Sequence, residues 1–461
     1  MTKFRLFTVL TLLLVYSISA IAQQDLKALV GGRLIDGYGG PPLANSVILI
    51  KGNTIEAVGT TSSLKVPDGY QIISTEGMDV LPGLWDSHVH MMLAGHGDYG
   101  RWFSEFGGRI LDEVIPAKGE QFLLSGVTTI RDLGAPLETI LEARKRFDNG
   151  AYKGPRLLVA GPFLQHKPYP GTEMARWGLD NPRDARDKVN QLADAGVDFI
   201  KLIDMDWMDI ESARAVVDTA HARGLKVIAH SRRPEEIRIG IELGIDNFEH
   251  SGMTSAPDYS QATRNIIMGR TSIGEDTGVP LYWTPTASYY ANYSANIANQ
   301  EFIDDNCWQR GLNDDMVDDI RASLSQPGQL QHGWLNRIRE KSVRHKTQEL
   351  HRLGAVLLVG TDNGIPFNFS CQSTADEVVT LTQDFGLPVM DVIRGASYWP
   401  AKLMGVFDRW GTVEKGKYAD IIAIGGDVLR FPALFKKVDL VIKDGILYKE
   451  NGQAIESAFQ P

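Results

Sequence analysis

The stretch Leu81-Pro82-Gly83-Leu84-Trp85-Asp86-Ser87-His88-Val89-His90 is a short apolar run that ends in two histidines one residue apart. In a β-strand, residues i and i+2 project to the same face, so a strand here would present both imidazoles together. Neutral imidazole binds zinc and other transition metals. A single His-x-His is a weak signal, because two histidines can fall at this spacing by chance. Features elsewhere in the chain are needed to distinguish a chance pair of histidines from a metal site.

On the C-terminal side of this stretch, predicted strands alternate with predicted helices. The strands are short apolar runs of the kind found in buried parallel sheets, at residues 80–90, 127–132, 156–160, 198–203, 226–230, 246–250, 281–285 and 355–361. Helical patterns cover residues 182–195, 209–223, 234–243 and 334–353. Each of these helices is followed by a glycine and then a strand, as a left-handed cap predicts. The α/β pattern predicts a (β/α)8 TIM barrel over residues 80–409, with an open doubly wound sheet as the alternative.

The two ends of the chain have a different pattern. Residues 47–50 and 55–58 read as a hairpin, and residues 420–424, 438–442 and 443–448 read as strands and a turn. We therefore expect residues 23–79 and 410–461 to form one composite β-sandwich domain, with the barrel inserted between its halves.

Residues 1–22 have the features of a signal peptide. Lys3 and Arg5 precede an apolar run, and Ala20-Ile21-Ala22 has the form of a cleavage site. We expect an exported, periplasmic or extracellular protein with no membrane attachment after cleavage; a retained membrane anchor is the alternative. The formal charge of -10 and the lack of a basic stripe argue against nucleic acid as a partner.

Polar residues collect where the predicted barrel strands end, which is where barrel enzymes have their active sites. Each has an ordinary reading by itself: a buried salt bridge for the lysine, a hydrogen-bonded core position for a histidine, a turn cap for the aspartate. Chance is a poor explanation for finding such residues at the ends of five predicted strands. The residues are His88, His90, Lys201, His230, His250 and Asp362.

Together these residues resemble the pattern of the amidohydrolase superfamily, in its binuclear-metal branch. The resemblance covers nearly the whole chain after residue 22, including the split β-sandwich. It implies that His88, His90 and Asp362 bind one divalent ion and that His230 and His250 bind a second. It also implies that Lys201, carboxylated by carbon dioxide, bridges the two ions, which we expect to be zinc. The motifs that carry it are residues 81–90, Phe199-Ile200-Lys201, His230, Glu249-His250 and Gly360-Thr361-Asp362.

The residue types suit the chemistry that this resemblance implies. An ammonium group cannot bind a cation, but a neutral lysine amine can add carbon dioxide to form an anionic carbamate, and burial favours the neutral amine. Two metal ions about 3.5–4 Å apart can share a bridging hydroxide whose pKa is near neutrality. Asp362 would accept its proton as a general base and pass it to the leaving amine. The expected reaction is hydrolysis of an amide or ester.

Within the superfamily, the chain resembles Xaa-Pro-type dipeptidases, N-acyl-amino-acid hydrolases and ochratoxin-type amidases. Members of that branch often have a tyrosine two residues after the strand-5 histidine, where this chain has Arg232. We expect Arg232 to bind a substrate carboxylate, with a surface salt bridge as the alternative. We expect His166 to donate a hydrogen bond to the developing oxyanion, with a plain loop role as the alternative. The expected substrates are small dipeptides or N-acyl amino acids with a free carboxylate.

Other readings stay open. A deaminase, a lactone or phosphotriester hydrolase, or a barrel that only binds ligands would share much of this pattern. Cys307 and Cys371 can pair if the protein is exported, or remain free thiols. The long segment between the seventh strand and residue 334 is expected to be a partly helical lid that sets specificity, together with residues 363–371. The sequence does not decide whether the chain forms a homo-oligomer.

Overall fold

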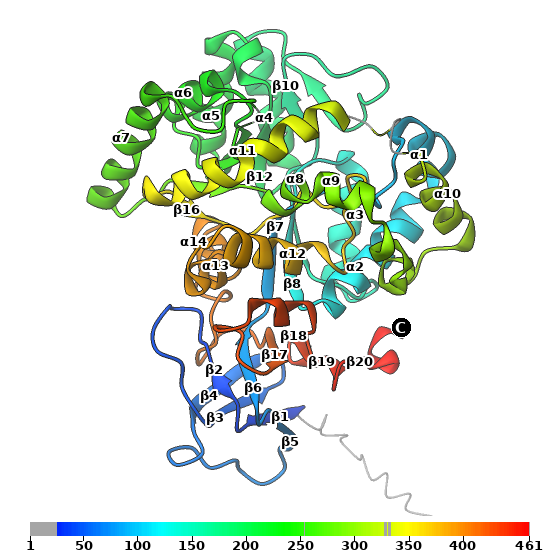
Figure 1. Ribbon diagram of the computed structural model, residues 1–461, viewed down its shortest axis with the longest axis vertical. Coiled ribbons are helices and arrows are strands. Elements are labelled where there is room, and N and C mark those ends of the chain that lie inside the picture. Colours follow the sequence, from blue (N-terminus) through cyan, green and yellow to red (C-terminus); the bar gives the residue numbers. More distant parts are fainter. Residues whose placement is uncertain (1–24, 253, 327–329, 331–332, 461) are drawn as a thin grey trace, which may run out of the picture.

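The computed structural model describes residues 25–460 except 253, 327–329 and 331–332. The predicted signal peptide lies outside the described residues. Figure 1 shows two parts: a β-rich part built from both chain ends, in blue and red, and a larger part of strands and helices above it.

The β-rich part contains two sheets that share one hydrophobic cluster. The first has the order β4-β3-β1-β5, with β1 Leu26–Val30, β3 Ser46–Lys51, β4 Thr54–Thr60 and β5 Gln71–Ser74. The second has the order β2-β6-β17-β18-β19-β20, with β2 Arg33–Leu34, β6 Met78–Pro82, β17 Ile421–Gly425, β18 Leu440–Lys443, β19 Ile446–Glu450 and β20 Gln453–Ala454. Both expected hairpins are present, β3 with β4 and β18 with β19.

Strand β17 joins the two parts of the molecule through the alternation of its side chains. Ile421 and Ala423 lie in the cluster between the two sheets, whereas Ile422 and Ile424 belong to the cluster of the larger part. Successive residues of a strand point to opposite faces, so one apolar strand packs on both sides at once. This explains why all four side chains are fully buried.

One predicted element is wrong. The run 80–90 was expected to be a single strand, but it forms β6 and β7 (Leu84–Val89), which belong to different sheets. Gly83 lies between them, and a Cβ at this position would clash with the side chain of Thr128. The chain passes from one sheet to the other at this glycine, so the terminal part extends to Pro82, beyond the expected boundary at residue 79.

The remaining strands of the larger part are parallel and lie in two sheets. The first is β7-β8-β9, with β8 Val127–Asp132 and β9 Arg156–Val159. The second is β11-β10-β12-β13-β14-β15-β16, with β10 Phe163–Gln165, β11 Arg176–Gly178, β12 Phe199–Leu202, β13 Lys226–His230, β14 Asn247–Glu249, β15 Tyr282–Thr284 and β16 Val356–Leu357. Strands β10 and β11 were not predicted, because each has only three residues.

Backbone hydrogen bonds connect the two parallel sheets at both junctions. The amide of Ser87 donates to the carbonyl of Val359 at 2.9 Å, and the amide of Asp198 donates to the carbonyl of Val159 at 2.9 Å. These bonds connect the two sheets through residues that follow β16 and precede β12, and the carboxyl ends of the parallel strands face the same side.

Helices surround these strands (Figure 1). The four expected glycine caps are present, with φ from 75° at Gly224 to 86° at Gly354. The segment after β15 is helical, as expected for a lid. The helices are α1 Tyr99–Phe106, α2 Ile115–Leu124, α3 Leu137–Asp148, α4 Pro182–Ala195, α5 Ile210–Ala222, α6 Pro234–Leu243, α7 Gln261–Thr277, α8 Ala287–Ala291, α9 Tyr293–Ala298, α10 Asp314–Leu324, α11 Gly333–Arg352, α12 Ser373–Val379, α13 Val389–Gly395 and α14 Tyr398–Leu403.

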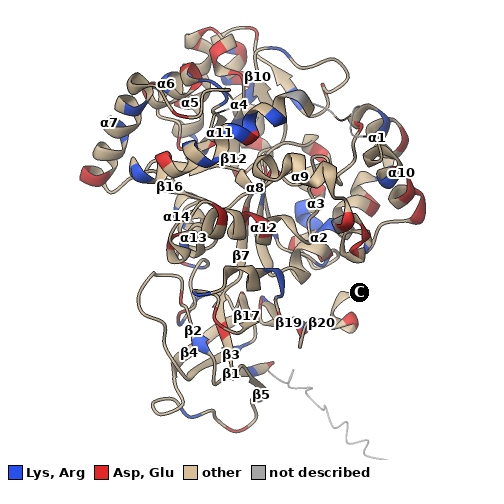
Figure 2. Cartoon of the chain, in the orientation of Figure 1, with Lys and Arg blue, Asp and Glu red and all other residues tan. Residues whose placement is uncertain are grey.

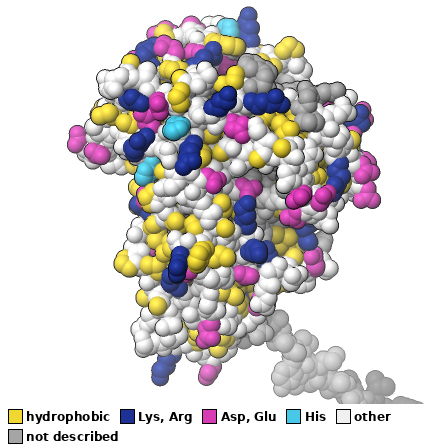
Figure 3. Space-filling model, in the orientation of Figure 1, with side chains coloured by type: hydrophobic (Ala, Val, Ile, Leu, Met, Phe, Trp, Pro, Cys, Tyr) yellow, Lys and Arg dark blue, Asp and Glu magenta, His cyan; other side chains and the backbone are white. Residues whose placement is uncertain are grey.

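A disulfide between Cys307 and Cys371 ties the lid segment to the loop that follows the last parallel strand. Of the two alternatives that the sequence left open, a disulfide and two free thiols, the structure has the disulfide. Acidic and basic residues are interspersed along the helices in Figure 2, and their side chains are interspersed on the face that Figure 3 shows. Within the described residues, no helix combines the length and apolar character needed to cross a bilayer.

Candidate functional site

The carboxyl ends of the parallel strands bring the predicted histidines and Asp362 together. Ligand atoms of His88, His250 and Asp362 all lie within 4.8 Å of one another, and the three side chains are buried. The Nε2 atoms of His88 and His90 lie 3.3 Å and 3.2 Å from Oδ1 of Asp362. The ring of His230 lies 4.8 Å from that of His250, measured between centroids.

Three buried nitrogen atoms at this site have no hydrogen-bond partner among the described residues: Lys201 Nζ, His90 Nδ1 and His230 Nδ1. Lys201 is fully buried on β12, and burial lowers its pKa to about 7. Buried polar groups are normally paired, so unpaired nitrogens at one place indicate a missing ligand. Imidazole, carboxylate and a carboxylated amine are donors that divalent metals accept, and the residues present therefore fit a metal centre.

The protonation states also suit metal binding. Burial lowers the pKa of His88, His230 and His250, which favours neutral imidazoles. Burial alone would raise the pKa of Asp362, but the neighbouring imidazoles of His88 and His90 outweigh it and the net pKa is well below the usual range. The cluster therefore offers neutral nitrogens and an ionised carboxylate.

Backbone strain marks two of the predicted ligands. His250 and Asp362 have φ values of 68° and 57°, in the left-handed region that residues other than glycine rarely adopt. His250 directly follows β14, and Asp362 lies in the segment that follows β16. Such strain persists only where surrounding contacts enforce it, and it is concentrated at functional sites.

Several buried residues that we did not predict hold the histidines in place. Glu249 Oε2 lies 2.7 Å from His88 Nδ1, and Thr286 Oγ1 lies 2.8 Å from His250 Nδ1. Lys118 donates to the carbonyl of His90 at 2.7 Å. Asp86 accepts from the hydroxyl of Thr361 at 2.7 Å and from the amide of His88 at 3.2 Å, which ties the two ligand-bearing strands together. Glu249 and Asp86 lie close to predicted ligands in the sequence, and this is the only sequence feature that could have indicated their supporting role.

The two predicted substrate-binding residues, Arg232 and His166, differ in their contacts. Arg232 follows β13 beside the cluster and pairs with Asp204, whose Oδ1 accepts from Nη1 at 3.1 Å. Its Nε is buried without a partner in the described residues. The partly buried His166 follows β10, and no described residue of the cluster contacts its imidazole. The expected role of His166 therefore stays a prediction.

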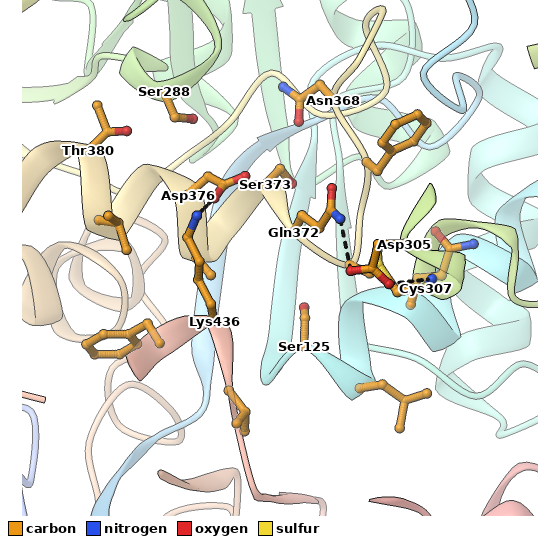
Figure 4. A pocket seen from close by; sticks show the side chains of 18 of the residues that line it. Ser125, Ser288, Asp305, Cys307, Asn368, Gln372, Ser373, Asp376, Thr380 and Lys436 are labelled. Atoms are coloured by element: carbon orange, nitrogen blue, oxygen red, sulfur yellow. Dashed lines mark hydrogen bonds and ion pairs between the residues drawn. A yellow bond between two sulfur atoms is a disulfide. The ribbon is translucent and has the colours of Figure 1, made fainter. Parts of the chain in front are cut away.

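A cavity of about 680 Å³ lies elsewhere, between α12, the loop before it and the C-terminal strands (Figure 4). None of the six predicted ligands lines it. Asn368, in its wall, donates from Nδ2 to the carbonyl of Thr361 at 2.7 Å, and so supports the turn that carries Asp362. The cavity borders the candidate metal centre without being part of it.

Parallel strands with a buried histidine–carboxylate cluster at their carboxyl ends define a metal-dependent α/β enzyme. The model of the amidohydrolase family matches residues 80–447, and the chain belongs to this family. It is a metal-binding hydrolase that acts on carbon–nitrogen bonds. Uncharacterized proteins of Mycobacterium tuberculosis and Mycobacterium bovis are each 31% identical to it over 388 residues, which are 80% of this chain and 85% of the relative.

Solved structures show the same fold. A putative prolidase from Bifidobacterium longum has a TM-score of 0.70 at 24% identity, covering 94% of this chain and 97% of that one. A Xaa-Pro dipeptidase has a TM-score of 0.69 at 22% identity, covering 92% and 100%. The ochratoxinase of A. niger has a TM-score of 0.67 at 20% identity, covering 93% and 96%. The family and these neighbours imply the predicted (β/α)8 barrel.

Proposed function

We propose that this protein hydrolyses the amide bond of small substrates that carry a free carboxylate, either dipeptides or N-acyl amino acids. The observation that carries the proposal is the buried group of His88, His250 and Asp362 beside the unpaired amine of Lys201. A surface salt bridge or a structural lysine would not leave these atoms buried and unsatisfied.

The proposed metal ligands are His88, His90 and Asp362 for one ion and His230 and His250 for the other. Lys201, as a carbamate, would lie between them, because its neutral amine can take up carbon dioxide. Bound divalent ions, zinc in this proposal, would polarise the scissile carbonyl and supply a nucleophile at neutral pH.

Residues of the chain supply the rest of the chemistry. Asp362, ionised and close to Nε2 of His88 and His90, is the proposed general base, which then protonates the leaving amine. Arg232 retains donors beyond the one given to Asp204, and we assign it to the substrate carboxylate. His166 is assigned a hydrogen bond to the oxyanion.

We also propose that residues 1–22 direct export and are removed, so that the enzyme works outside the cytoplasm. The disulfide between Cys307 and Cys371 supports this proposal, because disulfides persist in oxidising compartments. The test is the N-terminal sequence of protein recovered from a periplasmic or culture fraction. A mature chain that begins near Gln23 agrees with the proposal, and an intact Met1 in the cytoplasm contradicts it.

The test of function is an assay of the protein, purified with zinc and bicarbonate, on dipeptides and N-acyl amino acids. The same protein is also assayed for ammonia release and for hydrolysis of lactones and phosphotriesters, which are the comparison reactions. Amide cleavage that needs metal supports the proposal, and activity only in a comparison reaction contradicts it. For Arg232, we expect Arg232→Ala to lower kcat/KM on a free acid far more than on its amide. Arg233→Ala is the matched control, because Arg233 pairs with Asp206 instead.

A further inference from the structure

A second buried arginine lies close to the candidate metal centre. Arg339, on α11, is 8% exposed, and its guanidinium lies 5.1 Å from the centre of the Tyr290 ring. Its Nη1 donates to the hydroxyl of Tyr290 at 3.3 Å and to Oδ1 of Asn336 at 3.1 Å. The Tyr290 ring in turn lies 6.1 Å from the ring of His250. Arg339 is therefore one side chain away from a proposed metal ligand.

A third arginine, Arg176, lies near His90. The guanidinium of Arg176 lies 4.6 Å from the ring centres of both Phe163 and Tyr169. The Phe163 ring lies 5.6 Å from the ring of His90. Arg176 donates to Oε1 of Gln165 at 2.9 Å. Two aromatic faces and a neutral amide hold this cation.

The positive charge of these arginines is not balanced by the protein. Among the described residues, Arg176 and Arg339 form no ion pair with a carboxylate, whereas Arg232 forms an ion pair with Asp204. Glu236 also lies near Arg232, but it accepts from the backbone amides of Arg232 and Arg233, and burial raises its pKa to about 7. Three guanidinium groups thus share one ion-paired carboxylate.

A buried charge without a partner is unfavourable, so an uncompensated guanidinium at a substrate site indicates an anionic ligand. The Nε of Arg339 is buried and has no partner within the described part of the chain. The Nε of Arg232 is in the same state. Each side chain thus keeps donor capacity that a carboxylate could use, because guanidinium binds carboxylates in two-pronged fashion. A substrate with one carboxylate would satisfy only one of them.

We propose that the residue that the substrate releases is a dianion: the substrate is a dipeptide or N-acyl amino acid that ends in aspartate or glutamate. Arg232 binds the α-carboxylate, and Arg339, reaching in from α11, binds the side-chain carboxylate. Arg176 adds positive charge beside Arg232. This inference rests on the proposed amide hydrolysis and names the substrate class of that site.

The experiment compares N-acetyl-glutamate with N-acetyl-glutamine, which differ only in the charge of the side chain. With the zinc-loaded enzyme, we expect kcat/KM to be at least about tenfold higher for the acid, as is usual for loss of one charged hydrogen bond. Arg339→Gln should lower kcat/KM for the acid far more than for the amide, so that the preference disappears. Arg344→Gln, which removes an exposed arginine from the same helix, should keep the preference.

Equal use of the two substrates by the wild-type enzyme overturns the inference, whatever the variants do. An equal loss on both substrates in Arg339→Gln also overturns it, because that result indicates a structural role. Calorimetry measures the affinity of the enzyme for glutarate and for its monoamide, and this measurement does not depend on catalysis. If no amide is cleaved, the proposed function fails, whereas tighter binding of glutarate that is lost in Arg339→Gln still supports the dianion pocket. Equal binding of the two ligands overturns it.

Discussion

Nδ1 of His88 lies 2.7 Å from Oε2 of Glu249, and both side chains are fully buried. A carboxylate at this distance accepts a hydrogen bond from Nδ1–H and so favours the tautomer in which Nε2 carries a lone pair. Nε2 is the atom that faces Asp362, at 3.3 Å. Glu249 therefore orients His88 so that Nε2, the atom proposed to bind metal, faces Asp362.

Glu249→Gln keeps the shape of this side chain and removes its charge. We expect metal affinity to fall by about 10–100-fold, because the imidazole becomes less basic and less firmly held. Competition between the protein and a chelator for zinc measures the change. Unaltered zinc affinity in the folded variant would mean that His88 is not a ligand of the type proposed.

Thr286 has the same relation to His250, with 2.8 Å between Oγ1 and Nδ1. Thr286→Val removes the hydroxyl and keeps the volume, so we expect weaker metal binding and lower kcat. Thr286→Ser is the matched control, because it keeps the hydroxyl and should stay close to the wild type. If the two variants lose metal and activity to the same extent, the hydrogen bond has no role in holding His250.

Gly360 lies where the backbone of the last parallel strand approaches His88. A Cβ here would lie 2.9 Å from the amide nitrogen of His88. Gly360→Ala should therefore lower stability by about 1–3 kcal/mol, as overpacking does, and also lower metal content. Gly40→Ala adds a methyl group where no atom lies within 4 Å, and it should change neither property. Thermal unfolding and metal analysis test both, and a Gly360→Ala protein with wild-type stability would contradict the close approach.

The disulfide closes a loop with a sequence separation of 64 residues. Chain entropy predicts that a loop of this size stabilises the fold by about 4 kcal/mol. The double variant Cys307→Ser/Cys371→Ser should therefore unfold at a lower temperature than the oxidised protein. A thiol assay should find no free thiol before reduction and two after it. Two reactive thiols in the untreated native protein would contradict the pairing.

Much of the fold was predictable because its signals are local. The periodicity and caps of α4 and α6 and the apolar run of β13 gave the observed bounds. The split between β6 and β7 was missed because both are apolar, and only Gly83 marks the change of sheet. Which sheet a strand joins depends on pairing with β17, more than 300 residues away.

At the candidate site, too, features with local sequence signals were predicted and features that depend on distant contacts were missed. His88, His250 and Asp362 were predicted to lie together because ionisable residues at the ends of apolar strands are unusual, and the structure brings them together. The contact between Glu249 and His88 joins residues 161 positions apart. Arg339 lies in a helical pattern with many charges, and nothing local distinguishes it from its exposed neighbours. Its burial belongs to the tertiary packing, which includes the contact with Tyr290.

The most direct test of the account is an anomalous diffraction map at the zinc edge, from crystals grown with zinc and bicarbonate. The account predicts two peaks about 3.5–4 Å apart. One should lie beside His88, His90 and Asp362 and the other beside His230 and His250, with additional density on Nζ of Lys201 between them. Peaks elsewhere in the molecule, or an unmodified Lys201 with no metal beside these histidines, would contradict the proposed metal centre.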